Sequence, residues 1–432
     1  MTELHPRDPH PREAHPRDPQ LCDPQPRDPR PRDPEPRDPG PGDPQPLDPR
    51  PSDSASGDSH PRDSRRAEQT GLRCRVKVGS ADGILAVVPH LLGFHPAESL
   101  VLLGIGGPHA RIRLAFRYDL PDPPEEGLAA DIAEHAATVL GREHLTMAIA
   151  IGYGTGQAVT PVVDVVVPAL GQAGIAVQDV LRVQDGRYWS YVCSDPACCP
   201  PEGVPFDPAG HPAATALAAA GLGVRADRAA LVRTLAPSVE AAQPMSRAVE
   251  RARSRAGRLV DDALAVPGSD PLQSIADAGR RSIRLAVTAY RRGDELTDYD
   301  EVAWLGLVLF DLRVRDDAWA RMDPQFNEAH LRLWTQLVRL LPEEFVPAPA
   351  ALLAFTAWQA GDGALASVAI ERALRADPGY SMALLIADAL HAGLPPSAAR
   401  LPMTPKQVAA SYAKRRRPTS ARAANQRRRK VS

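Results

Sequence analysis

The chain has 432 residues, of which 43% are hydrophobic, and a formal net charge of -2. That length allows one large core or two moderate ones, and the near-neutral charge excludes a chain built as a whole to bind a polyanion or a polycation. Nearly all positive charge is arginine, which is typical of a GC-rich genome, so arginine content is poor support for nucleic-acid binding.

Residues 1–71 form a segment rich in proline, arginine and aspartate. PRDP occurs five times there, and 18 of the 46 prolines lie in the first 64 residues. Such frequent proline excludes the interiors of helices and sheets and favours polyproline II. Few apolar side chains are available to offset the entropy lost on ordering. We expect a disordered tail, and a proline-motif ligand, a spacer and a repeat without a role all remain open.

The first residues contain no apolar run of the kind found in secretory signals, and no stretch of eighteen apolar residues occurs. We therefore expect a cytoplasmic protein with no membrane partner.

Residues 72–210 predict an α/β or α+β domain. Alternating or continuously apolar segments predict strands at 74–78, 99–107, 111–120 and 145–154. Helices are predicted between Ser80 and Gly93, over 125–140, and from near Pro161. The segment DVLRVQDGRYWSYV predicts a hairpin that turns at Asp185-Gly186.

Residues 211–398 predict an all-α domain, because apolar residues recur at helical spacing. The stripes consist of Ile283, Val287 and Tyr290; of Val302, Leu305, Leu309 and Leu312; and of Trp334, Leu337, Val338 and Leu341. Within this domain, residues 347–380 have the spacing of a tetratricopeptide-like hairpin, although an ordinary helical pair fits the same pattern. The residues that carry this spacing are Leu353, Ala354, Ala366, Ile370, Ala373 and Pro378.

Residues 399–432 contain KRRRP and NQRRRK and predict a basic disordered tail. Arginines of this kind can contact phosphate backbones, but no aromatic residue follows Tyr412 to stack on bases. We expect no nucleic-acid partner except through this tail.

Three cysteines stand close together in the segment YWSYVCSDPACCPPEG, at Cys193, Cys198 and Cys199. In a reducing cytosol such cysteines bind metal, act as redox thiols or simply pack a loop, and the sequence leaves these three readings open. A zinc site needs four N or S ligands, and no second pair of ligands is spaced for one. We also expect the side chains of the adjacent Cys198 and Cys199 to diverge.

A second candidate site is the turn AIAIGYGTGQAV, where Gly152, Gly154 and Gly156 lie between a strand and a helix. Backbone N–H groups at such a turn can bind an anion, but the spacing is neither G-x-G-x-x-G nor a P-loop. His95 and Glu98 follow the first predicted helix and are candidate ligand-binding or acid–base residues.

The phrases SADGILAVVPHLLGFHPAESLVLLGI, RYDLP, GRYWSYVCSDPACCPPEG and AWQAGDGALASVAIERALRADPGYSMALLIADAL together resemble an uncharacterised actinobacterial family, domain of unknown function 4192. The resemblance covers roughly residues 72–395. It implies a cytoplasmic bacterial protein and places GFHP and CSDPACCP among the characteristic phrases, but it implies no activity, cofactor or catalytic residue.

No complete catalytic motif is present, so the sequence does not decide whether the chain is an enzyme. The first hypothesis is a non-enzymatic protein that binds a protein partner through its helical domain or senses a ligand. The alternative is a small-molecule or metal-dependent enzyme that uses the turn at Gly152–Gly156 together with Cys193, Cys198 and Cys199. The sequence identifies no cofactor.

Overall fold

The computed structural model describes residues 79–107, 110–121, 125–398 and 403–415. The tail predicted for residues 1–71 and the strand predicted at 74–78 lie outside these residues. Within the described ranges, no helix is both long enough and apolar enough to cross a bilayer.

The N-terminal half is built around one mixed sheet with the strand order β2-β1-β3-β4-β5-β6. Only β3 and β4 are parallel, and every other neighbouring pair is antiparallel. This confirms a sheet domain with intervening helices. The elements are α1 (Ala81–Leu92), β1 (Ser99–Gly106), β2 (Arg111–Asp119), α2 (Leu128–Arg142), β3 (Met147–Tyr153), α3 (Gly156–Gln172), β4 (Ala176–Gln184), β5 (Arg187–Ser190) and β6 (Val204–Pro205).

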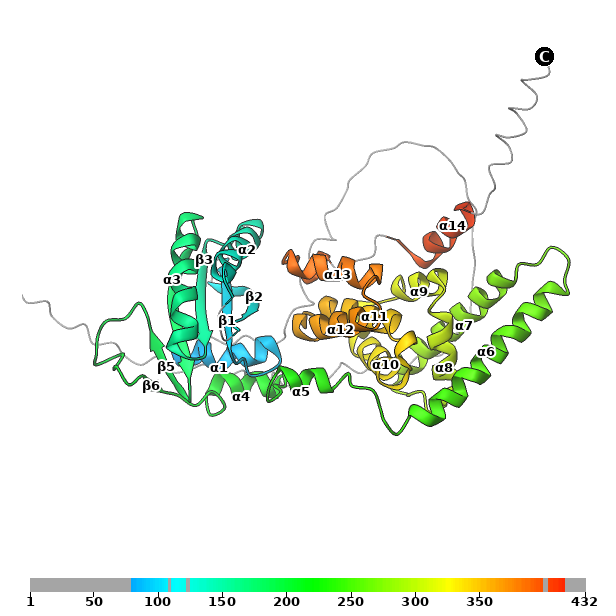
Figure 1. The fold of residues 1–432 in the computed structure, drawn as a ribbon, viewed down its shortest axis with the longest axis horizontal. Helices are drawn as coiled ribbons and strands as arrows, with labels where there is room; N and C mark the ends of the chain where they lie inside the picture. The colour runs from blue at the N-terminus through cyan, green and yellow to red at the C-terminus, as the bar shows by residue number, and fades with distance from the viewer. Residues whose placement is uncertain (1–78, 108–109, 122–124, 399–402, 416–432) are drawn as a thin grey trace, which may run out of the picture. The chain divides into compact units, whose positions relative to one another are not determined.

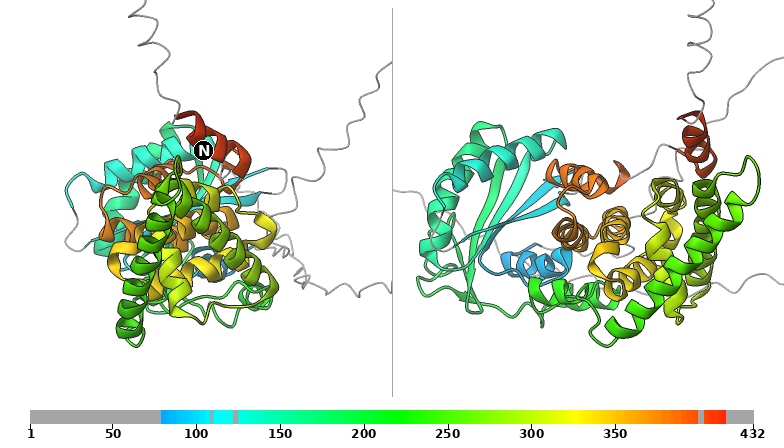
Figure 2. Two further views of the ribbon diagram at one scale, coloured as in Figure 1. Left: turned by 90° about the vertical axis from the view of Figure 1, so that its right-hand side faces the viewer. Right: turned by 45° about the vertical axis from the view of Figure 1, so that its right-hand side comes forward.

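The sheet is covered on both faces, which explains why β1 and β3 are apolar almost throughout. Leu100 and Leu102 of β1 pack with α2 and α3, whereas Val101 and Leu103 pack with α1. Figure 2 shows the sheet between α1 on one side and the pair α2 and α3 on the other. A side chain in a central strand therefore belongs to one of two distinct layers.

The predicted hairpin is confirmed. β4 pairs with β5 in antiparallel register, and Asp185 and Gly186 both have positive φ, at 50° and 69°. This is the backbone that a two-residue turn of the mirror-image type requires, and aspartate followed by glycine tolerates it.

Helices make up nearly all of the regular structure after β6, as predicted. They are α4 (Pro212–Ala219), α5 (Arg228–Arg233), α6 (Ala242–Leu264), α7 (Pro271–Arg292), α8 (Tyr299–Val308), α9 (Leu312–Trp319), η1 (Pro324–Phe326), α10 (Asn327–Leu340), η2 (Glu343–Phe345), α11 (Pro347–Ala360), α12 (Gly363–Ala376), α13 (Ser381–His391), η3 (Pro396–Ala398) and α14 (Pro405–Arg415). Phe94 forms a bridge with Arg225 and α4 packs on α1, so contacts with the sheet layer continue beyond residue 210. The domain boundary at that residue stays a prediction.

The predicted apolar stripes are buried, with one exception. Trp304 and Trp334 are among the largest fully buried side chains, and the Trp304 Nε1 donates to Ser282 Oγ at 3.0 Å. Leu312 is 50% exposed, contrary to the prediction. The reason is that α8 ends at Val308 and α9 begins at Leu312, so a single helical period does not run through this segment.

α11 and α12 are a pair of helices joined by two residues, and α13 packs on both. Leu353, Ala354, Ala366 and Ala373 are fully buried at their interface, as the spacing predicts. A helical pair is thus confirmed, whereas its relation to tetratricopeptide repeats stays a prediction.

Two predicted boundaries are wrong. The helix expected from near Pro161 begins at Gly156, because the Thr155 side chain caps it by accepting a hydrogen bond from the Ala158 N–H. Part of the segment predicted as a basic disordered tail forms α14. Thr404 and Gln407 bond reciprocally at its start, as in a capping box, and Val408 is buried.

Candidate functional site

The three cysteines of the loop between β5 and β6 converge. The sulfur atoms of Cys193, Cys198 and Cys199 all lie within 4.8 Å of one another, and the Cys198 and Cys199 sulfurs are 3.9 Å apart. All three are free thiols. The expectation that adjacent side chains diverge is therefore wrong for this pair. We call these three residues the thiol cluster.

Asp195 folds the loop so that the sulfurs meet. Its carbonyl accepts hydrogen bonds from the N–H groups of Cys198 (3.1 Å) and Cys199 (2.7 Å). Its carboxylate accepts a further bond from the Ala197 N–H at 2.9 Å. On the other side of Asp195, the Cys193 N–H donates to Ser190 Oγ at 3.2 Å. The chain consequently makes a tight turn between the first and the last two thiols.

The ends of the loop are fixed to the edge of the sheet (Figure 1). The Tyr191 N–H donates to the Val180 carbonyl at 2.8 Å where β5 ends. The Trp189 Nε1 donates to the Pro201 carbonyl at 2.9 Å, and Arg187 donates to the Gly203 carbonyl at 2.8 Å. The thiol cluster therefore lies on a loop that is held at both ends by side chains and backbone of the hairpin.

The pKa values of two thiols in the cluster are shifted in opposite directions. A backbone hydrogen bond from Asp195, followed by one from the Cys199 thiol, lowers the pKa of Cys193. The hydrogen bond to Cys193, followed by desolvation, raises the pKa of Cys199 to about 12. Cys193 thus ionises before Cys199, and the proton of Cys199 stabilises the Cys193 thiolate.

The spacing of the sulfurs suits a tetrahedral ion. Zinc–sulfur bonds of about 2.3 Å at tetrahedral angles put neighbouring sulfurs about 3.8 Å apart, close to the 3.9 Å between Cys198 and Cys199. Within the described residues, no histidine, aspartate, glutamate or further cysteine joins the group. Three thiolates would leave the fourth position of such an ion unfilled by any histidine, aspartate, glutamate or cysteine of the described residues.

Tyr188 of β5 lies within the electrostatic influence of both Asp82 and the thiol cluster. Desolvation raises the pKa of Tyr188 most, and Asp82, Cys199 and Cys198 raise it further. Asp82 in turn lies 3.9 Å from the His211 Nε2. No sequence pattern links Asp82, at the start of α1, with Tyr188, which stands more than a hundred residues later.

Side chains of Val159 and Glu98 fill the space next to Gly152 and Gly154 in the glycine turn. A Cβ on Gly152 would lie 2.1 Å from the Val159 Cγ1, so this glycine lets α3 pack on β3. At Gly154 the φ angle is 140°, and a Cβ would lie 3.0 Å from a Glu98 carboxylate oxygen. The Glu98 carboxylate thus stands near the α3 N-terminus, where an anionic ligand would otherwise be favoured. Gly156 is the first residue of α3.

His95 and Glu98 do not form a joint site among the described contacts. The His95 N–H donates to the Arg225 carbonyl at 3.1 Å, and its side chain is exposed. Glu98 lines a hollow of about 520 Å³ together with Asp119 and Thr155. Two carboxylates at this hollow disfavour the binding of an anion at the neighbouring glycine turn.

The glycine turn and the thiol cluster meet different layers of the sheet. Gly152 packs against Val159 of α3. Tyr188, whose pKa the thiols help to raise, packs instead in the layer of α1. No hydrogen bond or ion pair of the described residues joins Gly152, Gly154 or Gly156 to the three cysteines themselves, although Thr160 Oγ1, near the start of α3, and the hydroxyl of Tyr191, near the start of the cysteine loop, lie 2.7 Å apart. The start of α3 thus contacts the cysteine loop, whereas a combined site of the glycine turn and the three sulfurs stays a prediction.

A family model described as Domain of unknown function (DUF4192) matches residues 82–397, a span that contains the sheet, the thiol cluster and the helices up to η3. No curated protein and no solved structure matches the chain.

Proposed function

The chain belongs to this family of domains of unknown function, and from that premise we propose that it is a non-enzymatic, ligand-sensing protein of the actinobacterial cytoplasm whose thiol cluster binds a zinc ion. The observation that carries the proposal is the approach of three free sulfurs to within 4.8 Å on one fixed loop.

The chemistry of the donors supports a soft metal. Thiolates favour zinc or copper(I) over magnesium, calcium or manganese. The lowered pKa of Cys193 weakens the competition of protons with a metal at that thiol, and the ion would displace the protons that the cluster still holds. Reduced thiols also agree with a cytoplasmic location.

An open fourth position supports sensing. Cys198 is exposed, so a small ligand from solvent can reach an ion held there. The pKa of Tyr188 responds, after desolvation, to the charge of Asp82 of α1 and to the charges of Cys199 and Cys198. A change in the charge of the thiol cluster would therefore shift the pKa of Tyr188, which packs in the layer of α1.

The helical half is where we propose that a protein partner binds. On α13, which follows the tetratricopeptide-like pair, Leu384 and Leu385 are 41% and 63% exposed. Exposed leucines beside a helical pair supply the apolar contacts that a partner segment needs.

Metal analysis of protein purified anaerobically from its own host tests the zinc site. We expect about one zinc ion per chain. Cys198→Ser should weaken zinc binding by more than about 100-fold, since even outer-shell changes cost up to that much. Cys22→Ser is the matched control, because it removes a thiol outside the cluster.

Two results would refute the zinc site. One is the absence of zinc from the native protein combined with no uptake in a titration of the reduced protein. The other is an equal loss of zinc in Cys22→Ser and Cys198→Ser. Circular dichroism on each variant separates loss of the site from loss of the fold.

A metal-dependent enzyme is the second candidate, and one observation favours it. Asp82 and His211 lie 3.9 Å apart and offer an acid–base pair in the same half of the chain as the thiol cluster. A hydrolytic activity that needs zinc and is lost in His211→Gln, with zinc retained, would replace the sensing proposal by this one.

A further inference from the structure

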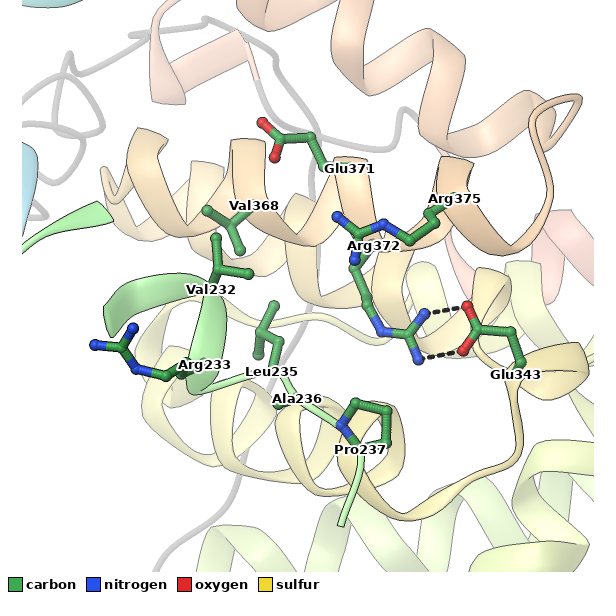
Figure 3. Close-up of a pocket in the computed structure, with 10 residues that line it drawn as sticks. All are labelled: Val232, Arg233, Leu235, Ala236, Pro237, Glu343, Val368, Glu371, Arg372 and Arg375. Carbon is green, nitrogen blue, oxygen red and sulfur yellow. Dashed lines mark hydrogen bonds and ion pairs between the residues drawn. The ribbon is translucent and has the colours of Figure 1, made fainter. Parts of the chain in front are cut away.

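A separate pocket of about 310 Å³ lies between α5 and α12 (Figure 3). One wall is formed by the end of α5 and the segment that follows it to Pro237. The other is formed by α12, and Glu343 of η2 closes one side. The volume is at the lower end of the range for small-molecule sites, so a ligand of this pocket is small.

The inner part of the pocket is apolar. Val232 and Leu235 face α12 from the α5 side, and Val368 lines the pocket from α12 itself (Figure 3). Leu235 and Val368 are almost completely buried. The partly exposed Val232, backed by these two side chains, offers an apolar surface to an aliphatic or aromatic group but no hydrogen bond.

Arg372 and Arg375 of α12 bring positive charge to the same pocket. Arg372 is 6% exposed and forms a two-pronged ion pair with Glu343. Its Nε, which is also buried, has no hydrogen-bond partner among the described residues. A buried N–H donor without an acceptor is costly, and a bound oxyanion would satisfy it.

The carboxylates that line the pocket are already engaged. Glu343 pairs with Arg372, and Glu371 pairs with Arg228 of α5. Arg375 is exposed and forms no ion pair with any carboxylate of the described residues. The pocket therefore has one unpaired guanidinium and one unpaired N–H donor, and no free carboxylate to compete for them.

We propose that the α5–α12 pocket binds a small amphipathic oxyanion, a carboxylate or phosphate with a short apolar chain. The anionic group is held by Arg375 and the Arg372 Nε, and the chain lies on Val232, Leu235 and Val368. This site is distinct from the thiol cluster and does not depend on zinc.

Calorimetric titration of the full chain with four probes of equal chain length tests the proposal. Octanoate and octyl phosphate carry the two oxyanions, whereas octanol is neutral and octylamine is cationic. We expect both anions to bind and the other two not to bind. The tighter of the two anions identifies the head group.

Variants separate the two halves of the site. Arg375→Glu should weaken binding of the anions by about tenfold or more, as expected for loss of a charge-assisted contact. It breaks no ion pair of the described residues, so the fold should be retained. Ala236→Trp, at an exposed lining position, should block the apolar part. Arg284→Glu, at an exposed position on α7, is the matched charge control.

Three results would overturn the proposal. Equal binding of octanol and octanoate would show that charge plays no part. If inorganic phosphate and octyl phosphate bind equally tightly, and Ala236→Trp changes neither affinity, then the apolar wall takes no part in binding. Equal weakening by Arg375→Glu and Arg284→Glu would place the effect outside this pocket.

Discussion

His330 of α10 should make the helical half less stable in mild acid. Its side chain is 1% exposed, and neither ring nitrogen has a hydrogen-bond partner among the described residues. Burial, with a contribution from Arg291, lowers the pKa of His330 from 6.5 to about 4. The imidazole is therefore neutral in the folded protein at neutral pH.

The sign and size of the effect follow from proton linkage. Between pH 6.5 and pH 4 the unfolded chain binds a proton that the folded chain does not, so the free energy of unfolding decreases as the pH falls through this window. A difference of 2.5 pKa units corresponds to about 3 kcal/mol when the window has been crossed. Below about pH 4, His330 is protonated in both the folded and the unfolded chain, so this contribution to the free energy of unfolding no longer changes with pH.

His330→Phe removes the titration and keeps an aromatic ring beside Trp334, whose ring centre lies 6.4 Å away. Urea denaturation at about pH 7.5 and about pH 4.5 should show that the wild type loses about 2.5 kcal/mol more than the variant. Other groups titrate in both proteins, so their effects cancel in this difference. At neutral pH the variant should be as stable as the wild type or more stable, since two unpaired buried nitrogens are gone.

A matched control replaces an exposed histidine, His95→Gln, which should lose as much stability on acidification as the wild type does. If His330→Phe and the wild type lose the same free energy between the two pH values, then His330 is not neutral and buried in the folded state, and the reasoning is wrong.

Further predictions concern packing and the thiol cluster. Gly152→Ala should lower the free energy of unfolding by about 1–3 kcal/mol, because the added methyl group overpacks against Val159. Gly171→Ala is the control, since its methyl group meets open space and should not destabilise the protein. Urea denaturation measures both effects. Val408→Asp should speed amide hydrogen exchange across α14, because a charge would replace a buried contact; unchanged exchange would contradict this docking. Zinc affinity should fall as the pH falls, because protons compete for the thiolates; an affinity independent of pH would exclude thiolate ligands.

The predictive limits of the sequence at the candidate site are visible in one loop. The spacing of Cys193, Cys198 and Cys199 placed three thiols close along the chain. It did not give the direction of their side chains, which depends on the backbone bonds to the Asp195 carbonyl. The aspartate followed by proline at Asp195 is the local signal for such a turn. No local pattern indicates that Asp82 of α1 influences Tyr188 of the hairpin.

The sequence by itself determined the kinds of element, and in the sheet layer it also determined most of their ends. Runs such as β1, the Asp185-Gly186 turn and the cap at Gly93 depend on side chains within a few residues, so local patterns are sufficient to predict them. Tertiary structure alone decided that β1 lies between β2 and β3, that Val159 requires a glycine at position 152, and that α5 meets α12 across some 140 residues. Such contacts depend on which faces pack together, and the periodicity of each element specifies its own apolar face but not the partner that covers it.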